Sequence, residues 1–103
     1  MAQFLANAFS LQMVHLSNYT LNVTEVQPEE IPTTVASCVG HEDTARVLSD
    51  MLGFEVPQRR INLCLGTKDE LFVAQLQGGR LPEGATTLPD GFTFRFFRIT
   101  VTA

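Results

Sequence analysis

The chain has 103 residues, which is the length of one ordinary domain and leaves no room for a second hydrophobic core. Hydrophobic residues make up 45% of the chain and charged residues 17%, a composition that excludes a mainly disordered protein. The formal net charge of −4 disfavours DNA or long RNA as a partner, because an acidic surface repels a polyphosphate unless positive charge is concentrated locally.

Two sequence features bear on where the protein works. No apolar run approaches the roughly 20 residues that cross a bilayer, and no basic stretch precedes a hydrophobic segment near the start. We therefore expect a cytoplasmic protein with no membrane partner. Cys38 and Cys64 are too few and too far apart for a disulfide framework, so we expect both to be reduced core residues.

The first third of the chain contains two predicted strands. Residues 2–9 are apolar enough for a buried strand, and Asn7 and Ser10 mark its end because their side chains cap or turn the backbone. Residues 10–16 fit a short helix better than a strand. Residues 19–26 alternate between apolar and polar side chains, which is the period of a half-buried strand.

The middle third contains the main helix. A connection with two prolines leads to a short buried strand over residues 33–39, which Gly40 ends. From His41 onward the apolar residues recur at spacings of three and four, acidic residues fill the first turn, and Gly53 follows the last turn. The pattern predicts one long helix between His41 and Gly53.

The last third contains the remaining strands and a long loop. Residues 61–65 and 71–76 are short apolar runs around a polar turn, which is the pattern of a β-hairpin. Residues 77–91 hold four of the seven glycines and predict a loop with little structure of its own. Residues 92–101 are aromatic and β-branched, and predict a final strand.

Together these elements predict an α/β fold. We expect a single domain over residues 1–103, with a mixed β-sheet of five or six strands, one long helix and one or two short helices, mainly on one face of the sheet. A sheet of this size leaves apolar surface that a second copy can cover, so we expect a homodimer.

Of the two histidines, His41 is the candidate for chemistry. His15 lies among apolar residues with no obvious partner, which is typical of a packed or surface side chain. His41 follows Gly40 where a strand meets a helix, and the free N–H groups of a helix terminus bind anions. The alternative is that Gly40 and His41 only cap the helix, and that the negative charges of Glu42 and Asp43 stabilise the positive end of its dipole.

The glycine-rich loop supplies a second pair of candidates, Arg80 and Glu83. A guanidinium suits phosphate oxygens, and a carboxylate can orient an imidazole or accept a proton. The alternative is a solvated turn with one surface ion pair. The preceding Gly78 and Gly79 do not make a phosphate-binding loop by themselves, because the Walker-type spacing and its Lys-Ser/Thr pair are missing.

Three segments of the sequence, in this order and spacing, carry a resemblance that covers almost the whole chain. They are Asn7-Ala8-Phe9-Ser10 after the first strand, Val39-Gly40-His41-Glu42-Asp43-Thr44 at the start of the main helix, and Arg80-Leu81-Pro82-Glu83-Gly84 in the late loop. Together they resemble the viral anti-CRISPR ring nucleases that act against type III systems, and the cellular relatives of these enzymes.

The resemblance implies a homodimer that binds cyclic tetra-adenylate, the second messenger of type III CRISPR defence. It implies cleavage of this ring into linear di-adenylates without a metal or other cofactor. His41, Arg80 and Glu83 match the catalytic residues of the family. The ligand-binding residues implied by the resemblance are Asn7, Ala8, Phe9, Ser10, Gly40 and Gly79.

Metal-free RNA cleavage needs a 2′-hydroxyl that attacks phosphorus in line, stabilised charge on the phosphorane, and a proton for the leaving 5′-oxygen. We hypothesise that His41 is the general acid, that Arg80 clamps the phosphate, and that Glu83 orients or charges His41. Two other functions stay open: a module that binds or sequesters a nucleotide messenger without cleaving it, and a structural or nucleic-acid-binding viral protein. The net charge and the single lysine disfavour DNA binding.

Overall fold

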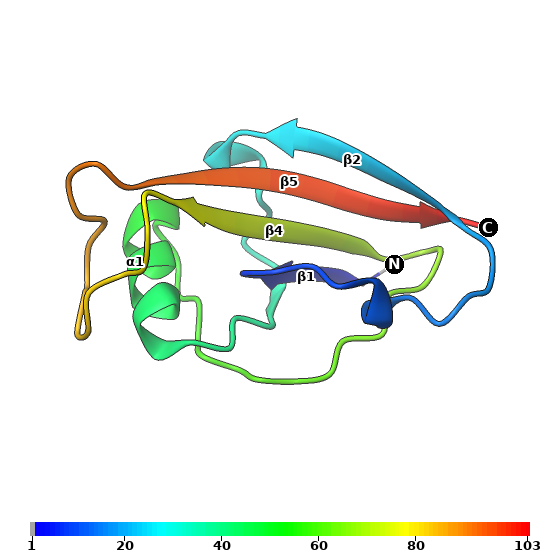
Figure 1. Cartoon of the computed structure of the whole chain (residues 1–103), viewed down its shortest axis with the longest axis horizontal. Coiled ribbons are helices and arrows are strands. Elements are labelled where there is room, and N and C mark those ends of the chain that lie inside the picture. Colours follow the sequence, from blue (N-terminus) through cyan, green and yellow to red (C-terminus); the bar gives the residue numbers. More distant parts are fainter. Residues whose placement is uncertain (1) are drawn as a thin grey trace.

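The computed structural model describes residues 2–103, which form one mixed β-sheet with helices beside it (Figure 1). The strands are β1 (Gln3–Ala6), β2 (Thr20–Val26), β3 (Ala36–Ser37), β4 (Glu70–Gln77) and β5 (Thr93–Thr102). The helices are α1 (Glu42–Leu52) and two single turns of 3-10 helix, η1 (Leu11–Met13) and η2 (Pro28–Glu30). This confirms the predicted α/β fold, with five strands in the sheet.

The strand order places three parallel strands side by side. The order is β2-β5-β4-β1-β3, in which β1 runs parallel to both β3 and β4, while β5 is antiparallel to β4 and β2. The N–H of Cys38 donates to the carbonyl of Leu5 at 2.7 Å, which extends the β1–β3 pairing beyond the two residues of β3. The carboxyl ends of β1, β3 and β4 therefore meet at the same end of the sheet.

Alternating side chains give the sheet two apolar faces. One face carries Leu5, Phe72 and Phe96, and α1 packs on it through Ala45 and Leu48. The other face has its own buried cluster, in which two residues from the segment before β4 cover the strands; this cluster includes Leu63, Leu65, Leu71, Val73, Ile99 and Val101. Burial of one such aliphatic side chain stabilises a fold by about 1.5–3 kcal/mol, so both faces contribute.

The helix α1 confirms the prediction from the sequence. It begins directly after His41, and Gly53 ends it in the left-handed conformation with φ +77°. The N–H of Gly53 donates to the carbonyl of Ser49 at 3.1 Å, and the hydroxyl of Ser49 accepts from the N–H of Val56 at 2.8 Å. These contacts turn the chain sharply after the helix. None of the helices in residues 2–103 has the length and apolarity that a membrane crossing requires.

The predicted hairpin between residues 61–65 and 71–76 is wrong. Residues 61–65 form no strand, and the N–H of Leu65 donates to the carbonyl of Met13 at 2.7 Å. The strand β4 lies instead between β1 and β5. Its first residues are buried on both faces, as expected for a central strand, and the spacing of residues alone does not say which strands are its neighbours.

Three smaller expectations also change. The strand predicted over residues 33–39 shrinks to β3, where the hydroxyl of Ser37 donates to the carbonyl of Pro57 at 2.6 Å at the edge of the sheet. The short helix predicted over residues 10–16 is the single turn η1. Cys64 is exposed rather than part of the core, while Cys38 is half-buried.

Near the two ends of the loop between β4 and β5, Gly78 and Gly91 approach each other closely. Gly78 has φ +111°, and a methyl group added to it would lie 2.7 Å from the carbonyl oxygen of Gly91. Side chains rarely adopt this conformation, and none fits in this space. Gly78 therefore fixes where the loop leaves the sheet.

We expect Gly78→Ala to lower the free energy of unfolding by about 1–3 kcal/mol more than Gly53→Ala does, measured by thermal melting followed by circular dichroism. Both glycines have a positive φ, but a methyl group at Gly53 meets nothing within 4 Å. The comparison separates the steric clash from the backbone strain that the two positions share. Equal losses of stability in both variants would contradict the close approach at the base of the loop.

Candidate functional site

The candidate site lies where the carboxyl ends of the parallel strands meet. Asn7 follows β1, the Gly40-His41 pair lies three residues beyond β3, and Arg80 lies three residues beyond β4. Ligands of sheets with parallel strands bind at this end, because the chain leaves the sheet there in loops and helix starts. Side chains that are far apart in the sequence are thereby brought to one place.

A cavity of about 540 Å³ occupies this place, and it brings together all three residues that the sequence assigned to catalysis, His41, Arg80 and Glu83. Its wall combines apolar side chains of β4 and β5 with polar side chains of α1 and the loop. The full lining is Asn7, His41, Asp43, Thr44, Ala74, Leu76, Arg80, Leu81, Glu83 and Phe94. Figure 1 shows the loop between β4 and β5 passing beside α1.

His41 is held by its backbone, and its side chain is exposed. It is the residue before the first turn of α1, and its carbonyl accepts from the N–H of Ala45 at 3.0 Å. The side chain of His41 makes no capping hydrogen bond. Beside it, the N–H of Gly40 donates to Oδ1 of Asn7 at 3.4 Å, and the Nε2 of Gln58 donates to the carbonyl of Gly40 at 3.2 Å. The imidazole is therefore available to a ligand.

Within residues 2–103, no hydrogen bond or ion pair joins the side chains of His41, Arg80 and Glu83 to one another. All three residues are exposed. The structure thus assembles an imidazole, a guanidinium and a carboxylate around one space without pairing them. Such a set can contact a phosphate, protonate an oxygen and orient a neighbouring group.

The residues predicted to bind a ligand divide into two groups. Asn7, Ala8 and Phe9 line a second cavity of about 420 Å³ on the sheet face away from α1. Asn7 and Ala8 also line a third cavity of about 320 Å³, together with Gly40. The other two residues lie outside these linings: Ser10 accepts a hydrogen bond from the N–H of Gln12 at 3.2 Å and so caps η1, and Gly79 lies in the first turn of the loop.

Sequence reasoning missed two residues beside His41. Arg60 lines the third cavity, and a methyl group added to Gly40 would lie 3.6 Å from its Cγ. The only sequence signal for this position is the Arg59-Arg60 pair, which lies between the predicted helix and residues 61–65. Asp43 lines the main cavity, in addition to the interaction with the helix dipole that its position in the sequence predicts.

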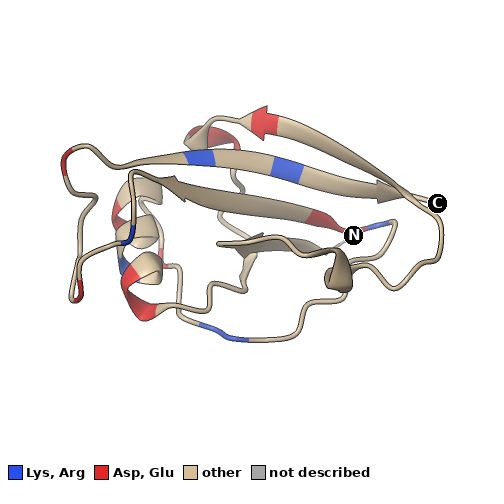
Figure 2. Cartoon of the chain, in the orientation of Figure 1, with Lys and Arg blue, Asp and Glu red and all other residues tan. Residues whose placement is uncertain are grey.

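Ion pairs neutralise basic residues away from the cavities. Arg95 pairs with Glu25 at 2.7 Å, Arg98 lies 3.9 Å from Glu70, and Arg46 pairs with acidic residues of α1. In the described part of the chain, no ion pair involves Arg60 or Arg80. Figure 2 shows the Lys and Arg positions spread over β5, α1 and the loops rather than in one segment of the chain. Arg60 and Arg80, which line the cavities, are therefore available to bind an anion.

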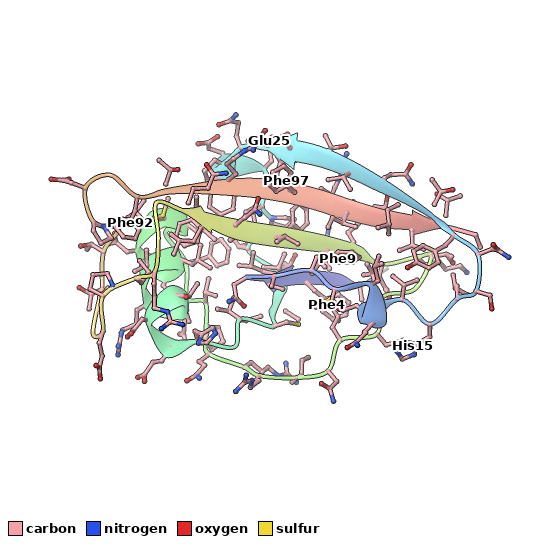
Figure 3. All side chains as sticks on the ribbon, viewed as in Figure 1. Phe4, Phe9, His15, Glu25, Phe92 and Phe97 are labelled. Carbon is pink, nitrogen blue, oxygen red and sulfur yellow. The ribbon has the colours of Figure 1, made fainter. Side chains whose placement is uncertain are left out.

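The other histidine, His15, lies apart from this site. Figure 3 places His15 near η1, at the other end of the long axis from Phe92 and the β4–β5 loop. Its Nδ1 lies 3.4 Å from the Sγ of the exposed Cys64. His15 lines none of the three cavities described above, in agreement with its interpretation as a surface side chain.

Comparisons with known proteins identify the fold. Residues 3–92 match the model of a protein family described as STIV B116-like. Among solved structures, the chain is similar to B116 of Sulfolobus turreted icosahedral virus, with a TM-score of 0.81 and 21% identity, over 97% of this chain and 99% of that chain. At this identity the similarity shows a shared fold. None of the curated proteins matches the chain.

The two cysteines provide a test of the burial of Cys38, which lines the third cavity. Burial raises the pKa of the Cys38 thiol, and this effect exceeds the lowering caused by Arg59. Because the thiolate is the reactive form, we expect Ellman's reagent at pH 8 to label the exposed Cys64 first and Cys38 more slowly, with the Cys38 rate rising as the pH increases. Cys64→Ser should abolish the fast phase and Cys38→Ser the slow one; two equally fast phases would contradict the burial of Cys38.

Proposed function

Because this chain belongs to the STIV B116-like family, we propose that it is a metal-independent ring nuclease that cleaves cyclic tetra-adenylate and so switches off type III CRISPR signalling. The three sequence segments that resemble the viral ring nucleases suggest the substrate. The observation that carries the proposal is the cavity that brings His41, Arg80 and Glu83 together from α1 and the β4–β5 loop. These are the residues that match the catalytic residues of the viral ring nucleases.

The proposed reaction is an internal transesterification. The 2′-oxygen of one ribose forms a bond to the adjacent phosphorus, the bond from phosphorus to the 5′-oxygen breaks, and the proton of the 2′-hydroxyl is lost while the 5′-oxygen gains one. Each cut leaves a 2′,3′-cyclic phosphate and a free 5′-hydroxyl. Two cuts at opposite phosphates convert the ring into two linear di-adenylates.

Each of the three side chains has a role in this reaction. His41 is the general acid that protonates the leaving 5′-oxygen, because histidine is the side chain that most often performs such a proton transfer in enzymes. Arg80 clamps the scissile phosphate with the forked donors of its guanidinium and stabilises the charge that develops on it. Within residues 2–103 of the ligand-free protein, Glu83 and His41 are not paired with each other; with the ring bound, Glu83 accepts a hydrogen bond from the imidazolium of His41 and keeps it oriented.

The backbone near His41 supports an anionic ligand as well. The first N–H groups of α1 have no partner inside the helix, and the positive end of the helix dipole lies at the same place. Arg60 adds a second guanidinium on the adjoining cavity. An acidic chain can therefore bind a small cyclic phosphate at one point while the rest of its surface repels long nucleic acids.

We also propose that the active form is a homodimer. The second cavity, on the sheet face away from α1, is an open apolar groove. Its apolar lining is Phe9, Val23, Val73, Phe97 and Ile99, and Val23 is 57% exposed. This groove shares Asn7 with the main cavity, so a second copy seated there lies next to the site. A two-fold arrangement supplies two copies of His41 to a ring whose opposite phosphates are equivalent.

Replacement of the general acid tests the proposed reaction. We expect His41→Ala to slow the turnover of labelled cyclic tetra-adenylate by about 10²–10⁴-fold while the binding affinity changes little, because the positive groups that hold the phosphates remain. Product chromatography should show di-adenylates with 2′,3′-cyclic phosphate ends, and EDTA should leave the wild-type rate unchanged. His15→Ala is the matched control, since that histidine lies outside the cavities, and it should keep full activity.

Other results of this assay have definite meanings. Undiminished turnover in His41→Ala would remove His41 from the mechanism. Tight binding of the ring by the wild-type protein without cleavage would favour the module that sequesters a messenger. The absence of binding would favour a structural viral protein.

The dimer is tested by a charge placed on the open groove. We expect Val23→Glu to shift the protein from dimer to monomer in size-exclusion chromatography with light scattering, because a buried carboxylate without a partner is costly. Leu11→Glu is the matched control: Leu11 is 63% exposed, belongs to η1 and lies outside the groove, so this variant should remain dimeric. A Val23→Glu protein that is still dimeric would place the interface elsewhere.

A further inference from the structure

Asp43 connects the helix to the loop that carries two of the proposed catalytic residues. Its Oδ2 accepts a hydrogen bond from the backbone N–H of Gly84 at 3.2 Å, 41 positions along the chain. Its other oxygen accepts from the guanidinium of Arg46, one turn further along α1. The two oxygens of one carboxylate thus bind the loop and the helix at the same time.

This contact has no substitute among the hydrogen bonds of residues 2–103. The loop makes two internal backbone bonds, from the N–H of Ala85 to the carbonyl of Pro82 and from the N–H of Phe92 to the carbonyl of Pro89, both at 3.1 Å. Between Gly79 and Asp90, the bond from Gly84 to Asp43 is the one that joins the loop to another part of the chain. The base of the loop is fixed by the close approach of its glycines, and its far side is held by Asp43.

The position of this contact suits a role in the site. Gly84 directly follows Glu83 and lies four residues after Arg80, while Asp43 lies two residues after His41 and lines the same cavity. A hydrogen bond between these segments sets the distance between the loop and the start of α1. A displacement of about 1 Å in such groups is enough to slow a reaction strongly.

We propose that Asp43 is a positioning residue, which holds Gly84 and thereby keeps Arg80 and Glu83 in register with His41. The catalytic part of this inference rests on the proposed ring-nuclease function, whereas the tether itself does not. Asp43 does not touch the reacting atoms. A carboxylate is tolerated beside a phosphate site because Arg46 balances its charge, and because one of its oxygens is engaged by the loop.

The neighbouring Glu42 provides a matched control. It carries the same charge, lies in the same turn of α1 and pairs with the same Arg46 at 3.1 Å, but within residues 2–103 none of its hydrogen bonds reaches the loop. Glu42→Ala and Asp43→Ala therefore remove equal charge from the helix terminus, and only Asp43→Ala removes the acceptor for Gly84. Asp43→Asn is the conservative variant, since its amide oxygen can still accept from Gly84.

The tether is tested in the ligand-free protein by hydrogen exchange of the Gly84 amide, measured by NMR. Loss of one hydrogen bond of this kind shifts a local opening equilibrium by a factor of about 5. We expect exchange at Gly84 to be faster by about that factor in Asp43→Ala, and close to wild type in both Glu42→Ala and Asp43→Asn. Equal exchange in the two alanine variants would overturn the tether.

The positioning role is tested by the turnover of cyclic tetra-adenylate. We expect Asp43→Ala to lower kcat by about 5-fold or more, with Asp43→Asn restoring it and Glu42→Ala leaving it unchanged. If Gly84 exchanges faster but kcat of Asp43→Ala equals that of the wild type, the positioning role is overturned. If the wild-type protein does not cleave the ring at all, the proposed function fails, and the exchange measurement still decides whether Asp43 holds the loop.

Discussion

The candidate site depends on the parallel pairing of β1 with its two neighbours. Because β3 and β4 both run in the direction of β1, the chain leaves all three strands at the same end of the sheet. Asn7, His41 and Arg80 follow these strands, so the hydrogen-bond ladder between the strands determines that they meet. An antiparallel β1 would send Asn7 to the opposite end and divide the site, whatever the chemistry of its residues.

The sequence predicted the elements whose signals are local. The helix α1 has apolar spacing and a terminal Gly53, and β2 has a strict alternation, so both were found close to their observed bounds. The hairpin was wrong because the pairing of β4 with β1 joins residues far apart in the chain, and no local pattern records it. The same holds for Arg60, whose place beside Gly40 depends on the path of the segment after α1.

The candidate residues were predicted better than their arrangement. His41, Arg80 and Glu83 stood out as residue types near glycines and a helix start, and the structure places them on one cavity. Their common location could not be read from spacing, since 39 positions separate His41 from Arg80 and the strand order decides the distance. Ser10 shows the reverse case: its type predicted a cap, which the structure confirms because its hydroxyl caps η1, while the ligand contact implied by the resemblance stays a prediction.

The pairing of β4 with β5 does not depend on the length of the loop between them. The two strands pair through Gln77 and Thr93, and the chain between them adds nothing to the ladder. Insertions and deletions in such a connection cost little, because the entropy of closing a loop grows only slowly with its length. The enclosure of the candidate site can consequently diverge during evolution while the sheet below it keeps its shape.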